Sequence, residues 1–171
     1  LGAGFEAGLE RVVPALRELL ELTTDDLWLL MENSAGAGGT IGRSTDELAA
    51  IHDALDHPRL GLCLDSCHWY VSGVDVTDKA VLAAAVADID DRIGLDRLRC
   101  LHVNDSKAAL GSNLDRHETT GAGLIGDAGL RTFLAQPASP RSPCAPAPAL
   151  VRGIARAQAP SARHPSLLPA H

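Results

Sequence analysis

Six acidic and histidine side chains stand where short apolar runs end or in the loops that follow them: Glu32, Asp65, His68, His102, Asp115 and His117. Carboxylate and imidazole groups together suit zinc, manganese or iron better than calcium. Asp65 and His68 lie three residues apart across a turn, so both can reach one ion. Asp115 and His117 can point the same way if their loop is extended. Their joint placement predicts a metal site.

Each of these residues has a simpler interpretation when it is taken alone. An aspartate at a strand end more often caps a helix or forms a turn than binds a metal. His52 and His57 belong to a polar helix face and its loop, and no chemical role is assigned to them. Cys63 and Cys67 lack zinc-finger spacing and a second cysteine pair, which favours small core or loop residues.

The elements that must position the six side chains alternate along the chain. Helical periodicity and a capping box at Ser44 and Glu47 predict helices over 4–22, 44–55, 81–93 and 126–135. Pro14 predicts a kink or a later start for the first of them. Short apolar runs predict buried strands over 27–31, 60–64 and 98–101, and a glycine-rich loop spans 34–42.

This alternation predicts an α/β fold with parallel strands and crossover helices. The polar residues follow the ends of the predicted strands, and in a TIM barrel these ends open on one face, where active sites are built. Three or four strand–helix units cannot close an eight-stranded barrel, which usually takes ~250 residues. The sequence therefore predicts the later half of a TIM barrel.

The composition changes abruptly near Gln136. Residues 136–171 contain eight of the ten prolines and no acidic residue, whereas all 22 Asp and Glu residues lie in 1–135. We therefore predict a partial barrel domain over 1–135 and a disordered Pro/Ala-rich tail over 136–171. A natural linker would explain the tail, but a changed reading frame in GC-rich DNA is favoured. The chain opens at Leu1 rather than Met and is expected to be a fragment.

Charge and cysteine usage limit the class of protein. A net charge of −7 argues against DNA binding on charge alone. That objection weakens if the carboxylates hold metal ions, which reverse the local charge. No apolar run approaches the ~18 residues of a membrane span. The four cysteines do not form the dense framework of a small secreted domain, so a reduced, cytoplasmic setting is expected. The protein is also expected to be a monomer.

Three long motifs resemble those of the endonuclease IV family (AP endonuclease family 2, deoxyribonuclease IV). They are Met31-Glu32-Asn33-Ser34-Ala35-Gly36, Gly61-Leu62-Cys63-Leu64-Asp65-Ser66-Cys67-His68, and Leu101-His102-Val103-Asn104-Asp105-Ser106-Lys107 with Gly111-Ser112 and Asp115-Arg116-His117. The glycines at 121, 123 and 126 resemble the stretch that follows in the family, although this pattern alone would be weak. The match covers roughly residues 1–135.

The resemblance implies a zinc enzyme with three ions, with manganese as an alternative metal, that cuts double-stranded DNA on the 5′ side of abasic sites in base excision repair. Glu32 resembles the catalytic carboxylate that bridges two ions, and Asp65 and His102 resemble ligands of that pair. The set that resembles the third-ion site is His68, Asp115 and His117. The same resemblance places Trp69, Tyr70, Lys107 and Arg116 near DNA, with packing an open alternative for Trp69 and Tyr70.

The chain also departs from the family pattern. The family uses two further histidines from earlier strands and a glutamate from the last strand, and no acidic residue follows Asp127 here. We therefore expect this chain to bind zinc without cutting DNA. Two alternatives stay open. One is a metal-dependent sugar isomerase or epimerase of the xylose-isomerase-like barrels, and the other is a non-enzymatic metal-binding fragment.

Overall fold

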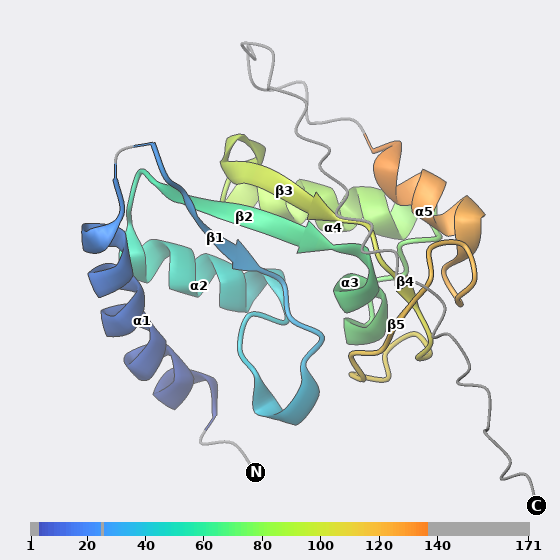
Figure 1. The fold of residues 1–171 in the computed structure, drawn as a ribbon, viewed down its shortest axis with the longest axis horizontal. Helices are drawn as coiled ribbons and strands as arrows, with labels where there is room; N and C mark the ends of the chain where they lie inside the picture. Colours follow the sequence, from blue (N-terminus) through green and yellow to red (C-terminus); the bar gives the residue numbers. More distant parts are fainter. Residues whose placement is uncertain (1–3, 25, 137–171) are drawn as a thin grey trace, which may run out of the picture.

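The computed structural model of the chain describes residues 4–24 and 26–136 (Figure 1). Within these residues a parallel sheet has its strands side by side in chain order: β1 (Leu29–Glu32), β2 (Leu60–Asp65) and β3 (Leu98–His102). Three long helices alternate with the strands: α1 (Phe5–Leu22), α2 (Thr45–Leu55) and α4 (Lys79–Arg92). Helix α2 packs against both α1 and α4. The predicted alternation of helices with parallel strands is therefore confirmed.

One face of the sheet is covered by these helices. Leu62 and Leu64 of the central strand are buried in the same core as Leu48 of α2 and Leu82 of α4. Because side chains alternate along a strand, Cys63 and Asp65 project from the opposite face. In a barrel that second face points to the interior, so it carries the candidate chemistry.

The predicted helix boundaries agree closely with the structure, except at Pro14. Ser44 caps α2, because its Oγ accepts a hydrogen bond from Glu47 N at 3.3 Å. Helix α1 begins at Phe5, so the later start predicted from Pro14 is wrong. The proline removes one backbone donor at a cost of about 3 kcal/mol. Packing of the apolar side of α1, which includes Leu9, Val13 and Leu16, offsets that cost.

Two features beyond the strand ends were predicted as loop, and the structure corrects both. Residues after Asp65 form helix α3 (Ser66–Ser72), whose first turn the Asp65 side chain caps. Farther along, β4 (Asp105–Ser106) pairs antiparallel with β5 (His117–Glu118). Propensity could not reveal these short elements, because a side-chain cap and a long-range strand pairing stabilise them.

The segment from β4 to helix α5 (Gly126–Leu134) is organised around Asp105. This fully buried carboxylate accepts hydrogen bonds from the backbone N–H groups of Ser106, Gly121, Gly123, Ile125 and Gly126, at 2.8–3.2 Å. A Cβ atom on Gly123 would lie 2.4 Å from Asp105 Oδ1, so only glycine fits there. Figure 1 shows α3, β4, β5 and α5 gathered beyond the carboxyl ends of the strands.

The described part of the chain is an open portion of a barrel. Three parallel strands with their crossover helices match the predicted later half of a TIM barrel in type and order. No helix among the described residues is long and apolar enough to cross a membrane. The disordered tail predicted over 136–171 lies, except for Gln136, outside the described residues.

Candidate metal centre

The three parallel strands deliver three of the candidate ligands to one edge of the sheet. Glu32 ends β1, Asp65 ends β2 and His102 ends β3. Asp65 and His102 are direct neighbours in the strand register. Parallel strands place their carboxyl ends together. Glu32 and His102, which are 70 positions apart in the chain, therefore come into contact.

Asp65 has two structural partners as well as its place in the cluster. Its Oδ1 accepts a hydrogen bond from His68 N at 2.9 Å, which is the helix-capping role weighed for it from sequence. Its Oδ2 accepts a hydrogen bond from Asn104 Nδ2 and lies 3.9 Å from His102 Nδ1. The side chain is fully buried. Asp65 therefore fixes the start of α3 and still turns one oxygen toward His102.

Asn33 is a structural residue of the site that sequence reasoning missed. Its Oδ1 accepts a hydrogen bond from Asp65 N at 2.7 Å, and its Nδ2 donates to Asp65 O at 3.1 Å. The Asn33 carbonyl also lies 2.8 Å from His68 Nδ1. This buried amide thus joins the ends of β1 and β2. Its position directly after Glu32 was the signal available from sequence.

His68 lies on the first turn of α3 and reaches both halves of the cluster. Its Nδ1 has two acceptors nearby, the Asn33 carbonyl and Glu32 Oε1 at 3.2 Å, so this nitrogen carries the hydrogen. Its buried Nε2 makes no hydrogen bond among the described residues and lies 3.4 Å from Asp115 Oδ2. In the neutral ring the lone pair of Nε2 would face the Asp115 carboxylate. This contact is favourable only if a proton or a cation lies between the two atoms.

Asp115 lies between the two histidines of the set that resembles the third-ion site. His117 Nε2, on β5, lies 3.3 Å from Asp115 Oδ1, and the rings of His68 and His117 are 5.4 Å apart at their centres. One ligand atom from each of the three residues lies within 4.8 Å of the others. Two nitrogens and a carboxylate oxygen in this arrangement can surround one ion.

The charges around His68 and Glu32 favour ionisation of both. Burial alone would lower the pKa of His68, but the hydrogen bond with Glu32 and two further carboxylates raise it to about 9. The hydrogen bond from His68 lowers the pKa of Glu32 against the opposing effect of burial. His102 Nδ1 also lies 3.0 Å from Glu32 Oε1. The site is therefore an ion-pair network that a cation could enter by displacing protons.

The cluster is buried at its base and open at its rim. The side chain of Asp65 is 1% exposed and that of His68 is 14% exposed, whereas those of His102, Asp115 and His117 are 43–48% exposed. This gradient leaves the rim of the cluster accessible to solvent.

The four side chains expected near DNA differ in their surroundings. Trp69 is buried and packs edge-on against Phe133 at 6.2 Å, so it takes the packing role that the sequence left open for it. Tyr70 is half-buried against both hydrophobic clusters. Lys107 is exposed with its Nζ 3.8 Å from Glu118 Oε2, and exposed Arg116 donates to the Asp115 carbonyl at 2.7 Å. Of these four side chains, only the last two present positive charge beside the cluster.

Cys63 and Cys67 are buried, which agrees with their predicted place in the core. Burial, and next the neighbouring Cys100, raise the pKa of Cys63 above its usual range. Burial likewise raises the pKa of Cys67 to about 11. Both side chains are therefore neutral thiols at neutral pH.

Together these features define a class of protein: a TIM barrel with carboxylate and imidazole groups at the ends of its strands. A family model described as a xylose isomerase-like TIM barrel matches residues 1–139. The chain therefore belongs to the AP endonuclease 2 family of these barrels.

Individual relatives agree with this assignment. A probable endonuclease 4 from Methanoculleus marisnigri is 45% identical over 144 residues, which are 83% of this chain and 51% of the relative. One from Heliobacterium modesticaldum is 44% identical over 139 residues, 81% of this chain and 49% of the relative. The crystal structure of endonuclease IV from Thermus thermophilus superposes with a TM-score of 0.66 at 33% identity, over 79% of this chain and 52% of that one. The chain spans about half the length of the curated relatives it matches.

Proposed function

We propose that this chain is part of a zinc-dependent endonuclease that hydrolyses the DNA phosphodiester 5′ of abasic sites during base excision repair. The observation that supports it best is the contact of Asp115 with His68 and His117, at 3.4 and 3.3 Å. Neighbouring ligands of a tetrahedral zinc ion lie about 3–4 Å apart, so these atoms need little movement to hold one. Manganese is the alternative metal, and the protein is proposed to act as a cytoplasmic monomer.

The geometry of His68 supports a metal more than a purely structural ion pair. A ligand histidine commonly donates its second ring N–H to a carbonyl or carboxylate, which fixes the tautomer. The Asn33 carbonyl and Glu32 take that role at Nδ1, so Nε2 is free to bind an ion beside Asp115. His117 would supply the second nitrogen.

Glu32, Asp65 and His102 are proposed to hold the remaining ions. Glu32 Oε1 contacts the rings of both His102 and His68, so this carboxylate lies between the two halves of the cluster. That position suits a bridging, catalytic carboxylate. Bound zinc ions would neutralise the phosphate and stabilise the departing 3′ oxygen.

Positive side chains at the rim are proposed to bind the DNA backbone. Lys107 and Arg116 lie opposite each other at one end of the β4–β5 pairing, where Lys107 N donates to Arg116 O at 2.8 Å. Both side chains are exposed, and phosphate contacts of this kind position DNA without reading its sequence. Tyr70 is proposed as a further contact through its exposed part.

A chimera tests the proposal, because this chain spans about half of its relatives. Residues 1–135 would replace the matching half of the Methanoculleus marisnigri relative. We expect chelator-sensitive incision of a duplex with one abasic site, and loss of incision in Glu32→Ala and His117→Ala chimeras. A folded, zinc-loaded chimera that isomerises a ketose and leaves the duplex intact would support the sugar isomerase alternative instead.

A further inference from the structure

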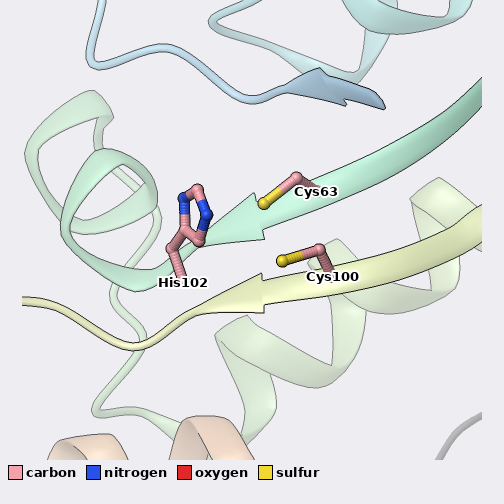
Figure 2. Close-up of side chains that lie close together, drawn as sticks. All are labelled: Cys63, Cys100 and His102. Atoms are coloured by element: carbon pink, nitrogen blue, oxygen red, sulfur yellow. The ribbon is translucent and has the colours of Figure 1, made fainter. Parts of the chain in front are cut away.

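Two cysteines lie directly beneath the strand-end carboxylates. Cys63 of β2 and Cys100 of β3 are neighbours in the parallel register, two residues before Asp65 and His102 respectively. Their side chains therefore project from the same face as those two residues. Figure 2 shows the two sulfur atoms next to each other, with the His102 ring beyond them at the ends of the strands.

The three side chains converge closely enough to share an ion. The two sulfur atoms and one ring nitrogen of His102 all lie within 4.8 Å of one another. Zinc–sulfur bonds of about 2.3 Å in a tetrahedral site require neighbouring sulfurs about 3.8 Å apart, so small rotations of these side chains suffice. Both cysteines are free thiols.

The chemistry of this set differs from that of the carboxylate cluster. Thiolate sulfur prefers soft cations, whereas carboxylate oxygen prefers hard ones. We propose that Cys63, Cys100 and His102 form a second site for a thiophilic cation such as Zn²⁺ or Cd²⁺, which shares His102 with the carboxylate cluster. Binding releases the two thiol protons to solvent.

Solvent can reach the fourth coordination position of this site. Cys63 is buried, but Cys100 is only partly buried and the His102 side chain is 47% exposed. Three protein ligands with one open position satisfy the usual four-coordination of zinc. The two sulfur ligands have no part in the proposed nuclease centre, and only His102 is common to both sites.

Cadmium titration of the whole chain tests the site. Cd²⁺–thiolate bonds absorb in the ultraviolet, so the purified chain should develop a saturable band as Cd²⁺ is added. We expect the band to be lost in Cys63→Ala and in Cys100→Ala, and to persist in the matched controls Cys67→Ala and Cys144→Ala. His102→Ala should keep thiolate absorption but bind Cd²⁺ more weakly. Far-ultraviolet circular dichroism checks that each variant folds.

A second measurement needs no substitution. Partly buried Cys100 should react with iodoacetamide in the metal-free chain and be protected by Cd²⁺, as read by mass spectrometry. A band that survives loss of Cys63 or Cys100, or unprotected Cys100 at saturating Cd²⁺, would overturn the proposal. Neither readout uses DNA, so failure here is distinct from failure of the proposed nuclease.

Discussion

His68 connects the two halves of the strand-end cluster through the two nitrogens of one ring. Its Nδ1 lies near the Asn33 carbonyl and Glu32, and its Nε2 lies near Asp115. Only the protonated ring can donate at both positions. The metal-free protein therefore keeps a proton where the proposed function places zinc, and proton and metal compete for Nε2.

Stability of the metal-free chain should fall as the pH rises through the titration of His68. The pKa of His68 is raised from 6.5 in the unfolded chain to about 9 in the fold. The stabilisation that protonated His68 contributes to the fold is therefore complete below about pH 6.5 and is lost as the pH approaches about 9. Its size is on the order of 2–3 kcal/mol. Urea unfolding in the presence of a chelator, repeated across this range, measures it.

Two variants separate this effect from a general response to alkaline conditions. His68→Gln removes the titrating ring, so its unfolding free energy should change little between about pH 6.5 and 9. His57 lies outside the cluster, so His57→Gln should show the same change of unfolding free energy with pH as the unmodified chain. An equal slope in all three proteins would contradict the assignment to His68.

Zinc binding should depend on His117 far more than folding does. Its side chain is 43% exposed, so His117→Ala should change the free energy of unfolding by no more than about 0.5 kcal/mol. Loss of a ligand should weaken zinc binding by at least about tenfold. Competition with a chromophoric chelator measures the affinity. His57→Ala, as the matched control, should bind zinc like the unmodified chain.

Polar contacts add to core packing in the elements that follow the strand ends, where α3 and α5 contribute Trp69 and Phe133 to the core. β4 and β5 are two residues each, and their pairing carries His117 opposite Ser106. Asp105 ties β4 to the glycine-containing turn before α5. Burial would raise the pKa of Asp105, but the backbone N–H donors outweigh it and lower the pKa. The carboxylate is therefore ionised in the fold.

Asp105→Asn should destabilise the chain strongly. The amide group would turn a donor toward backbone N–H donors that now face a carboxylate oxygen, at a cost of about 3 kcal/mol or more. Chemical unfolding gives the free energy, and hydrogen exchange at Gly121 and Gly123 should rise. Asp53→Asn is the control: its side chain is 74% exposed, and a change within about 0.5 kcal/mol is expected. Equal stability of both variants would refute the role of Asp105.

At the scale of the whole molecule, the described sheet is an open part of a closed architecture. Its outer strands β1 and β3 each pair on one side only among the described residues. In a complete barrel both edges would be covered, because closure leaves no free edge. The chain also spans about half of its relatives, such as 51% of the Methanoculleus marisnigri protein.

The chain of 171 residues should therefore bind zinc yet fail to incise an abasic duplex. The set proposed for one ion, His68, Asp115 and His117, lies entirely in this chain, whereas the ions that Glu32 is proposed to bridge are expected to need further ligands of the family pattern. A single remaining ion cannot stabilise both the attacking and the leaving oxygen. An incision assay with and without chelator measures this. Robust, chelator-sensitive cutting by the chain alone would overturn this account of the ligands.

The sequence by itself determined the features that depend on neighbours along the chain. The capping box at Ser44, the apolar runs of the strands and the polar residues that end them identified parallel strands and the six candidate ligands. These signals are local, because periodicity and caps act within a few residues. The family resemblance added the roles expected for those ligands.

Only the tertiary structure decided which of these groups meet. Three contacts join residues that are far apart in the chain. They are the hydrogen bonds between Asn33 and Asp65, the pairing of β4 with β5, and the strand register that puts Cys63 beside Cys100. Strand register and buried hydrogen bonds depend on packing against distant partners, which local propensity does not encode. For the same reason the dual contacts of His68 emerged only from the tertiary structure, and the burial of Trp69 decided between the two roles left open for it.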